Sequence, residues 1–298
     1  MTKLALDCGG ATDIGLVRDH NEDRYWIDPE GRAFLVVDGV GGHAAGERAA
    51  EIAVQAIQES VSGGASAPPD SLVREAITAA NNRIYNDALE RAELAGMACV
   101  LTLALVDGEQ VTVGHVGDSR LYLIGDGAIR KVTSDHSPVG QFEDAGELNE
   151  EEAMAHPRRN EVYRDVGSCL RSADDENFVE LCNFEIRDDT AMLLCSDGLS
   201  DHLTSNRIRE IVERYAGNAA QIAHDLVDAG NDAGGRDNIT VVLVTGSAFP
   251  RRKGGATRPR LAATRIRAHQ GMWRGRLAFL SYGLLLGMLL WAVLHIRG

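Results

Sequence analysis

Three strand-like runs follow one another between residues 99 and 125 with only short turns between them, and this order restricts the fold most. The runs are CVLTLALV (99–106), QVTVGHVG (110–117) and RLYLIG (120–125). The turn DGEQ joins the first two runs as a hairpin. Regular β-α-β alternation is missing from the chain. We therefore expect antiparallel sheets with helices on their faces, and not a doubly wound parallel sheet.

Helical periodicity flanks this strand-rich region on both sides. Residues 44–61 predict one helix, and a second begins at Asp70 or Ser71 and ends near Gly96. Two more helices are expected at about 205–215 and 218–232, before a last strand, ITVVLVTG. Strands are also expected in FVELCNFEI and TAMLLCS, whereas polar residues 138–172 predict a partly helical excursion outside the core.

Charge divides the chain of 298 residues into an acidic body and a basic tail. Residues 1–248 hold all 44 acidic residues against 20 basic ones, a balance of −24, whereas the remaining residues hold ten basic residues and no acidic one. The net charge of −14 argues against a nucleic-acid-binding protein. The five cysteines form no C-x-x-C pair, which disfavours a zinc knuckle and suits a reducing compartment.

The tail contains LAFLSYGLLLGMLLWAVLHI, residues 277–296, a stretch with no formal charge and the length of a membrane span. Nine basic residues lie between positions 251 and 276, and only Arg297 follows the stretch. This distribution predicts a single-pass protein of the inner (cytoplasmic) membrane, with the body in the cytoplasm. We expect an acidic domain at 1–248, a basic linker at 249–274 and an anchor at 275–298; a buried core helix is the alternative for the apolar stretch.

Several carboxylates stand at the ends of predicted strands, each beside glycine or another small residue. Asp38 follows FLVV, Asp197 follows AMLLCS, and Asp118 follows HVG. Asp237 and Asn238 come directly before the final strand. Any one of these Asp residues alone is more often part of a turn than a metal ligand. It is their joint occurrence, in this order, that indicates a site.

Carboxylate oxygens are the ligands that Mg²⁺ and Mn²⁺ prefer. Two such ions can activate a water molecule and neutralise a phosphate, and a carboxylate must then be shared between them. Asp38 is the candidate for this shared ligand, and Gly39 lets its own carbonyl approach a metal ion. The planar fork of Arg18, in the stretch RDHNED, can hold phosphate oxygens.

Together these stretches resemble the metal-dependent serine/threonine protein phosphatases of the PP2C-like (PPM) family, in their compact bacterial form. The resemblance covers residues 13–245 and rests on seven motifs in family order: RDHNED, VVDGVGGHAAGE, GHVGDSRLYL, DHS, HPRRN, LLCSDGLSD and RDNITVVLV. It implies an α+β fold, an αββα sandwich of two antiparallel sheets flanked by helices, to which the predicted C-terminal transmembrane helix would be added. The site is expected at one edge, between the sheets.

The resemblance also implies roles for individual residues. The implied metal ligands are Asp38, Gly39 through its carbonyl, Asp197, Asp237, Asp118 for a third and weaker ion, and Glu22 through water. Arg18 would bind the substrate phosphate, and Asn238 is a further substrate-binding candidate. His43 is either a proton donor to the leaving alcohol or a solvent-exposed turn residue. Residues 138–172 match the mobile flap beside the active site.

The expected function is hydrolysis of phosphoserine and phosphothreonine by a metal-activated water at a binuclear Mn²⁺ or Mg²⁺ centre. The alternative is a catalytically weak module of the same fold that binds phosphoproteins. Expected partners are phosphorylated proteins, among them a bacterial Ser/Thr kinase and its substrates, and the membrane, but not nucleic acid. Two stretches depart from the family pattern, MACVLT (97–102) and YRDVGS (163–168), and put the position of the flap in question.

Overall fold

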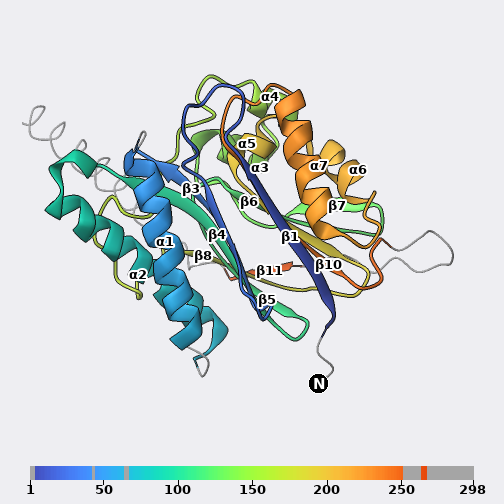
Figure 1. Ribbon diagram of the computed structural model, residues 1–298, viewed down its shortest axis with the longest axis horizontal. Helices are drawn as coiled ribbons and strands as arrows, with labels where there is room; N and C mark the ends of the chain where they lie inside the picture. Colours follow the sequence, from blue (N-terminus) through green and yellow to red (C-terminus); the bar gives the residue numbers. More distant parts are fainter. Residues whose placement is uncertain (1–3, 42–43, 64–66, 251–262, 267–298) are drawn as a thin grey trace, which may run out of the picture. The chain divides into compact units, whose positions relative to one another are not determined.

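The computed structural model describes residues 4–41, 44–63, 67–250 and 263–266. Within them, two antiparallel sheets lie between two pairs of helices (Figure 1), which confirms the expected sheet-and-helix arrangement. One sheet has the order β1(Leu6–Asp13), β10(Ile239–Gly246), β9(Ala191–Cys195), β6(Arg120–Gly125), β7(Ala128–Lys131). The other has the order β11(Ala263–Ile266), β8(Glu180–Glu185), β5(Gln110–Val116), β4(Ala98–Asp107), β3(Ala33–Val40), β2(Arg24–Ile27).

Helices cover the outer face of each sheet. The β2–β5 sheet is covered by α1(Ala44–Gly63) and α2(Pro69–Glu90), and the β1–β10 sheet by α6(Ser205–Val212) and α7(Ala219–Asp232). Figure 1 shows the first pair on one side of the strands and the second pair on the other. Helix α2 ends at Glu90, and a short 3-10 helix, Ala92–Leu94, follows it after the extended residue Arg91, before the expected helix end near Gly96.

Three apolar cores hold these four layers together. One lies between α1, α2 and their sheet, a second between α6, α7 and the other sheet, and a third between the two sheets. Side chains of strand β3 pack alternately into two of these cores. Phe34 and Val36 face the inter-sheet core, and Leu35 and Val37 face the helices. A strand buried on both faces reads as a continuous apolar run, as residues 34–37 do.

Strand β1 has no counterpart among the predicted elements. Its sequence, LDCGGATD, contains two glycines, which weaken the strand signal. The structure explains both glycines by close packing. A Cβ on Gly9 would collide with the backbone of Ala220 in α7, and one on Gly10 would collide with the ring of Tyr25. The glycines therefore let a helix and an aromatic ring approach the strand.

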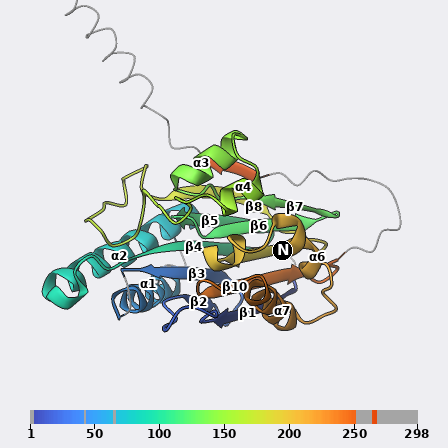
Figure 2. The same cartoon turned by 90° about the horizontal axis from the view of Figure 1, so that it is seen from above.

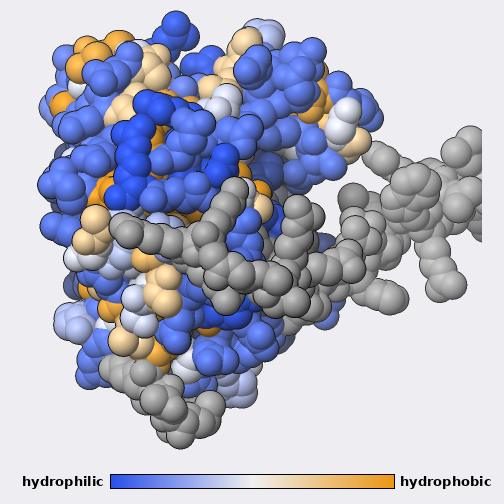
Figure 3. Space-filling view, turned by 90° about the vertical axis from the view of Figure 1, so that its right-hand side faces the viewer, coloured by the Kyte–Doolittle hydropathy of each residue, from blue (hydrophilic) through white to orange (hydrophobic). Residues whose placement is uncertain are grey.

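The excursion at 138–172 contains α3(Pro138–Ala145) and α4(Glu150–Met154), as its polar, broken pattern predicts. The two helices lie next to each other in Figure 2. Together with α5(Asp197–Ser200), they gather at the same end of the strands in Figure 1. The face that carries α6 and α7 is mostly hydrophilic, with scattered apolar spots (Figure 3).

The predicted membrane anchor, residues 275–298, lies outside the described residues. Among the helices that are described, none is both long enough and apolar enough to cross a bilayer. Of the predicted linker, residues 249–250 and 263–266 are described, and the latter form β11, which pairs antiparallel with β8. The domain boundaries drawn from the sequence stay predictions.

Candidate metal centre between the two sheets

The alternation of strand β3 directs Asp38 into the space between the sheets. Because side chains two apart share a face, Asp38 lies on the same side as Phe34 and Val36, at the edge of the inter-sheet core. From the opposite sheet, Asp197 opens α5 directly after β9, and Asp237 comes shortly before β10. The facing edges of two stacked sheets thus supply the predicted ligands.

Close backbone contacts fix the segments around Asp38 and Asp197. A Cβ on Gly39 would collide with the backbone of Gly46 and Glu22, and one on Gly198 would collide with the carbonyl oxygen of Asn238. Only glycine fits at such a distance. The DG pairs after β3 and β9 therefore have a packing reason: they let α1 and the β10 entry come close to the two carboxylates.

The carboxylates raise one another's pKa. Burial first, and then the charges of Asp23 and Asp197, raise the pKa of Asp38 well above its usual range; Asp118 and Asp237 act in the same direction. Burial and the charges of Asp118, Asp201 and Asp237 do the same for Asp197. We call Asp38, Asp118, Asp197 and Asp237 the carboxylate cluster. These mutual effects place the four side chains within electrostatic range of one another.

Basic side chains balance only part of this charge. The Arg18 guanidinium lies 2.7 Å from Asp237 Oδ2, and Arg159 Nε lies 2.9 Å from Asp201 Oδ2. Among the described residues, Asp38, Asp118 and Asp197 have no ion pair with a basic side chain. Buried like charges without counter-charges are unfavourable unless a cation joins them.

This donor set fits two hard divalent cations. It consists of carboxylate oxygens and the Gly39 carbonyl, with no sulfur or imidazole in the cluster, which suits Mg²⁺ or Mn²⁺. Asp118, Asp197 and Asp201 also line a small cavity shared with residues of the excursion, among them Arg159. A further cation would suit this cavity for the same reason.

Neighbouring polar residues hold the cluster in place. Asp23, which is 2% exposed, accepts a hydrogen bond of 2.7 Å from Ser196 Oγ. Burial raises the pKa of Asp23 to about 7, although the hydrogen bonds from Ser196 and Thr240 oppose the shift. The backbone N–H of Glu22 donates to Asn238 Oδ1 at 2.8 Å. Ser196 and Thr240 were not among the predicted site residues, because nothing but their place, directly after β9 and within β10, distinguishes them.

Asn238 has its two amide hydrogens engaged within the chain. Its Nδ2 donates to the carbonyl oxygens of Ile14 and His20, both at 2.9 Å. This arrangement ties the segment that carries Arg18 and Glu22 to the start of β10. Substrate binding by Asn238 stays a prediction that these contacts do not support. His43 lies outside the described residues.

Two of the quoted motifs meet behind the cluster. Arg120 of GHVGDSRLYL bonds Asp135 of DHS, with Arg120 Nη2 2.6 Å from Asp135 Oδ2, and also bonds Glu143 on α3 at 2.8 Å. Both Arg120 and Asp135 are buried. A buried, bidentate pair of this kind fixes geometry. It anchors α3 next to the cavity that Asp118 lines.

The two departures from the family pattern contact each other. Cys99 of MACVLT and Val166 of YRDVGS form an antiparallel bridge, with N–H···O distances of 2.9 and 2.8 Å. The next residue, Gly167, donates its N–H to Asn81 Oδ1 at 2.8 Å. The end of the flap segment is therefore held against β4 and α2 by backbone contacts, which depend little on the side chains that differ from the family.

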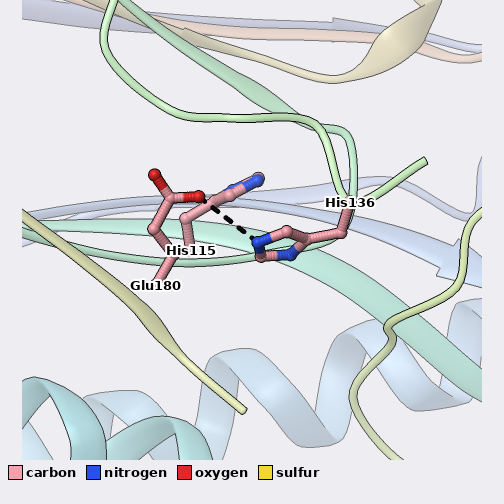
Figure 4. Close-up of side chains that lie close together, drawn as sticks. All are labelled: His115, His136 and Glu180. Carbon is pink, nitrogen blue, oxygen red and sulfur yellow. Dashed lines mark ion pairs between the residues drawn. The ribbon is translucent and has the colours of Figure 1, made fainter. Parts of the chain in front are cut away.

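A second buried cluster of titratable groups lies beside β5. His115, His136 and Glu180, which we call the histidine cluster, have potential ligand atoms within 4.8 Å of one another (Figure 4). His115 belongs to strand β5 and is fully buried. Burial and the neighbouring His136 lower the pKa of His115 to about 4.

Hydrogen bonds argue against a metal site in the histidine cluster. His136 Nδ1 accepts the N–H of Gly117 at 3.0 Å, so this nitrogen carries no proton, and Nε2 faces Glu180 at 3.3 Å. A metal-bound histidine instead donates its second N–H to an acceptor. His115 uses both ring nitrogens as well, with Thr102 Oγ1 and Gly117 O, both at 2.9 Å. The cluster is complete within the protein and shapes the turn before Asp118.

The chain resembles known proteins over most of its length. A sequence profile of the family described as Protein phosphatase 2C matches residues 17–229. The chain belongs to the protein phosphatase 2C family. It is 34% identical over 242 residues to the serine/threonine phosphatase stp of Listeria monocytogenes, covering 78% of this chain and 93% of that protein.

Other members of the phosphatase 2C family are equally similar in sequence. The serine/threonine protein phosphatase PstP of Mycobacterium tuberculosis is 34% identical over 244 residues, which cover 80% of this chain and 45% of PstP. Among solved structures, the catalytic domain of PstP in complex with two manganese ions superposes with a TM-score of 0.72 at 31% identity. The match covers 82% of this chain and 99% of that domain.

Proposed function

We propose that this chain is a metal-dependent protein phosphatase that hydrolyses phosphoserine and phosphothreonine with two Mn²⁺ or Mg²⁺ ions. One observation carries the proposal: Asp38, Asp118 and Asp197, which come from strand ends of two different sheets, lie close enough for Asp118 and Asp197 to raise the pKa of Asp38, and none of the three has an ion pair with a basic side chain among the described residues. Membership of the phosphatase 2C family and the manganese-bound PstP domain support the same conclusion.

Asp38, the Gly39 carbonyl, Asp197 and Asp237 would hold the two ions, with Glu22 acting through water and Asp118 at a further, weaker position. When bound, the two ions would lower the pKa of a water molecule and neutralise charge on the phosphate. Every residue in this set except Gly39 is acidic, so these ligands without cations repel a phosphate group. Substrate binding is therefore expected to require the cations.

Arg18 provides the protein's own attraction for the phosphate. Its side chain is 50% exposed, and one terminal nitrogen bonds Asp237. Burial lowers the pKa of Arg18. Its hydrogen bond with Asp237 and the charges of Asp237, Glu22 and Asp197 outweigh this effect, so the pKa lies above its usual value. The guanidinium therefore stays charged, and its remaining N–H groups can bind phosphate oxygens in a fixed fork.

The reaction needs an in-line displacement at phosphorus. A bond forms from the water oxygen to phosphorus, and the bond from phosphorus to the serine or threonine oxygen breaks. The leaving alcohol takes up a proton, and His43 is the residue that the sequence offers as its donor. Positioning and charge neutralisation would supply most of the catalysis.

The direct test is dephosphorylation of a phosphothreonine peptide by the full-length chain. Turnover is expected with Mn²⁺ and is expected to stop when EDTA is added and to return with excess Mn²⁺. Turnover that persists in EDTA would contradict a metal-dependent reaction. Binding of the peptide without turnover, at any Mn²⁺ concentration, would point to the phosphoprotein-binding alternative.

We further propose that residues 275–298 anchor the enzyme in the cytoplasmic membrane with the phosphatase domain in the cytoplasm. Support comes from the uncharged stretch 277–296 and from the basic residues that precede it. Full-length protein should sediment with membranes and be released by detergent, and a chain that ends at residue 274 should stay in the supernatant. Full-length protein found in the supernatant without detergent would rule the anchor out.

A bacterial Ser/Thr kinase and its targets are the substrates we propose for this enzyme. Support is limited to the relatives, whose names describe serine/threonine phosphatases. Removal of phosphate from an autophosphorylated Ser/Thr kinase of the same cell is the measurement that tests it.

A further inference from the structure

Most of the exposed large apolar side chains lie close in the sequence to the proposed site residues or in the flap segment. In the described part of the chain, the large apolar residues that are exposed are Ile14, Leu16, Val17, Val40, Leu89, Phe142, Tyr163 and Leu170. Four of them lie within four positions of Arg18 or Asp38, and three lie in the flap segment 138–172. Only Leu89, on α2, is in neither place. Single exposed apolar residues are ordinary, but a group beside a binding site marks contact with a partner.

Leu16 and Val17 are the most exposed pair in this group, at 68% and 66%. They lie on the loop between β1 and β2, and three consecutive backbone groups of that loop are bonded. Asn238 Nδ2 donates to Ile14 O at 2.9 Å, Gly15 N donates to Asp13 Oδ1 at 2.8 Å, and Leu16 N donates to Gly235 O at 2.7 Å. The loop holds the two side chains in place without burying them.

The same contacts place Leu16 against the segment that carries Asp237. A Cβ added to Gly235 would lie 2.7 Å from Leu16 Cγ, so the leucine side chain lies across that glycine. Arg18, two residues further along the loop, bonds Asp237 at 2.7 Å. Leu16 and Val17 are thus exposed apolar side chains on the same fixed loop as Arg18, and Leu16 lies against the segment that leads to Asp237.

We propose that Leu16 and Val17 form a substrate subsite that receives an apolar side chain of the phosphoprotein near its phosphorylated residue. This inference rests on the proposed function, because Arg18 must hold the phosphate. An extended chain advances about 3.3–3.6 Å per residue, so Leu16 lies within roughly 7 Å of Arg18 along the loop. The apolar substrate residue is therefore expected within about two positions of the phosphoresidue.

The position of both residues on the loop that carries Arg18 favours substrate over another occupant. A second copy of this chain placed on Leu16 and Val17 would cover the phosphate-binding arginine and block the reaction. A substrate side chain placed there gains apolar contact only when the phosphate is already bound. Because the loop is held before binding, little conformational entropy is lost when the contact forms.

The test compares two phosphothreonine peptides that differ only in leucine or serine at the positions flanking the phosphothreonine. Full-length wild-type enzyme with Mn²⁺ is expected to show a kcat/KM about tenfold higher for the leucine peptide. Leu16→Gln should reduce that ratio to near one, and Val17→Gln should reduce it partly. Leu89→Gln is the matched control, because Leu89 is equally exposed, at 68%, and lies outside the site; it should keep the full ratio.

Each result decides the inference. A wild-type ratio near one, or an unchanged ratio in both Leu16→Gln and Val17→Gln, overturns it. Circular dichroism checks that the variants are folded. Sedimentation of wild type and Leu16→Gln identifies self-association: a dimer lost in the variant would assign the surface to a second copy. Failure of the proposed function is separate, because wild type would then fail to hydrolyse p-nitrophenyl phosphate with Mn²⁺.

Discussion

The half-buried carboxylate cluster and the more deeply buried histidine cluster are both groups of titratable side chains, yet their charges are compensated in opposite ways. In the histidine cluster, His115 and His136 have hydrogen-bond partners at both ring nitrogens, and Glu180 faces His136. In the carboxylate cluster, like charges face one another and raise each other's pKa. A cluster whose polar groups all have partners within the protein stabilises the fold. A cluster of like charges without counter-charges instead needs a bound cation.

This difference corrects an inference from proximity alone. Of the two clusters, the histidine cluster has the tighter grouping of possible ligand atoms, within 4.8 Å. Its ring nitrogens, however, are already occupied by hydrogen-bond partners from the protein itself, which leaves none directed at a metal ion. The hydrogen-bond and ion-pair partners of each side chain therefore distinguish a binding site from a structural cluster better than the distances between ligand atoms do.

The largest loss of kcat is expected when one of the proposed metal ligands Asp38 and Asp197 is replaced. Asp38→Asn and Asp197→Asn should each reduce kcat for a phosphothreonine peptide by roughly 10³-fold or more, because charge stabilisation at the site is lost. Steady-state kinetics at saturating Mn²⁺ measure this, with Glu90→Gln, an exposed acid on α2, as control. Near-normal kcat in Asp38→Asn would sink the assignment of Asp38.

The histidine cluster should respond in the opposite way. His115→Asn is expected to lower the free energy of unfolding by about 3 kcal/mol, because Gly117 O and Thr102 Oγ1 lose a buried partner. The kcat of the folded fraction should change little. Urea unfolding and kinetics below the transition measure both; a large loss of kcat with unchanged stability would reverse the roles given to the two clusters.

Metal removal should destabilise only through the carboxylate cluster. Mn²⁺ at about 100 times its Kd should stabilise the native state by roughly 2.7 kcal/mol over protein in EDTA. In Asp38→Asn this gain should largely disappear, whereas His115→Asn should keep it. Thermal unfolding with and without Mn²⁺ provides the comparison. An equal gain in wild type and Asp38→Asn would place the stabilising ion elsewhere.

The smallest expected effect is on the pH dependence of the free energy of unfolding, to which Asp118 and His115 contribute with opposite signs. Burial and the charge of Asp135 raise the pKa of Asp118 to about 7, above its unfolded value of 3.8. The folded state therefore binds an extra proton as pH falls through 7. In EDTA, each such carboxyl should add about 1 kcal/mol of stability between roughly pH 7.5 and pH 6.

For His115 the sign is reversed, because its pKa is lowered from 6.5 to about 4. The unfolded state then binds the extra proton, and about 1 kcal/mol is lost over the same interval. Unfolding of wild type, Asp118→Asn and His115→Asn across this range separates the two terms. A wild-type slope that Asp118→Asn leaves unaltered would show that Asp118 is ionised throughout.

Sequence patterns predicted most of the elements, because β3, β4, β5 and β9 are buried on both faces and α1 and α7 have clear periodicity. They also singled out Asp38 and Asp197, since a carboxylate followed by glycine after an apolar run is a local signal. Strand β1 was missed because its glycines serve packing against Ala220 and Tyr25, which no local pattern reveals.

Contacts between residues far apart in the sequence could not be predicted either. The bridge between Cys99 and Val166 joins two stretches that had been noted separately as departures. The hydrogen bond from Ser196 to Asp23 spans 173 positions. Such pairs depend on the tertiary arrangement of segments far apart in the sequence, which no local pattern of residue types reveals.

The pairing of β1 with β10 has a consequence for biosynthesis. Leu6 lies opposite Gly246, and Arg18 and Asp237 come from the loops next to these two strands. A chain leaving the ribosome has released its first strand long before the last one is made. The enzyme would therefore stay inert until β10 is made, and the nascent polypeptide would acquire the power to cleave phosphoesters only when β10 emerges and pairs with β1.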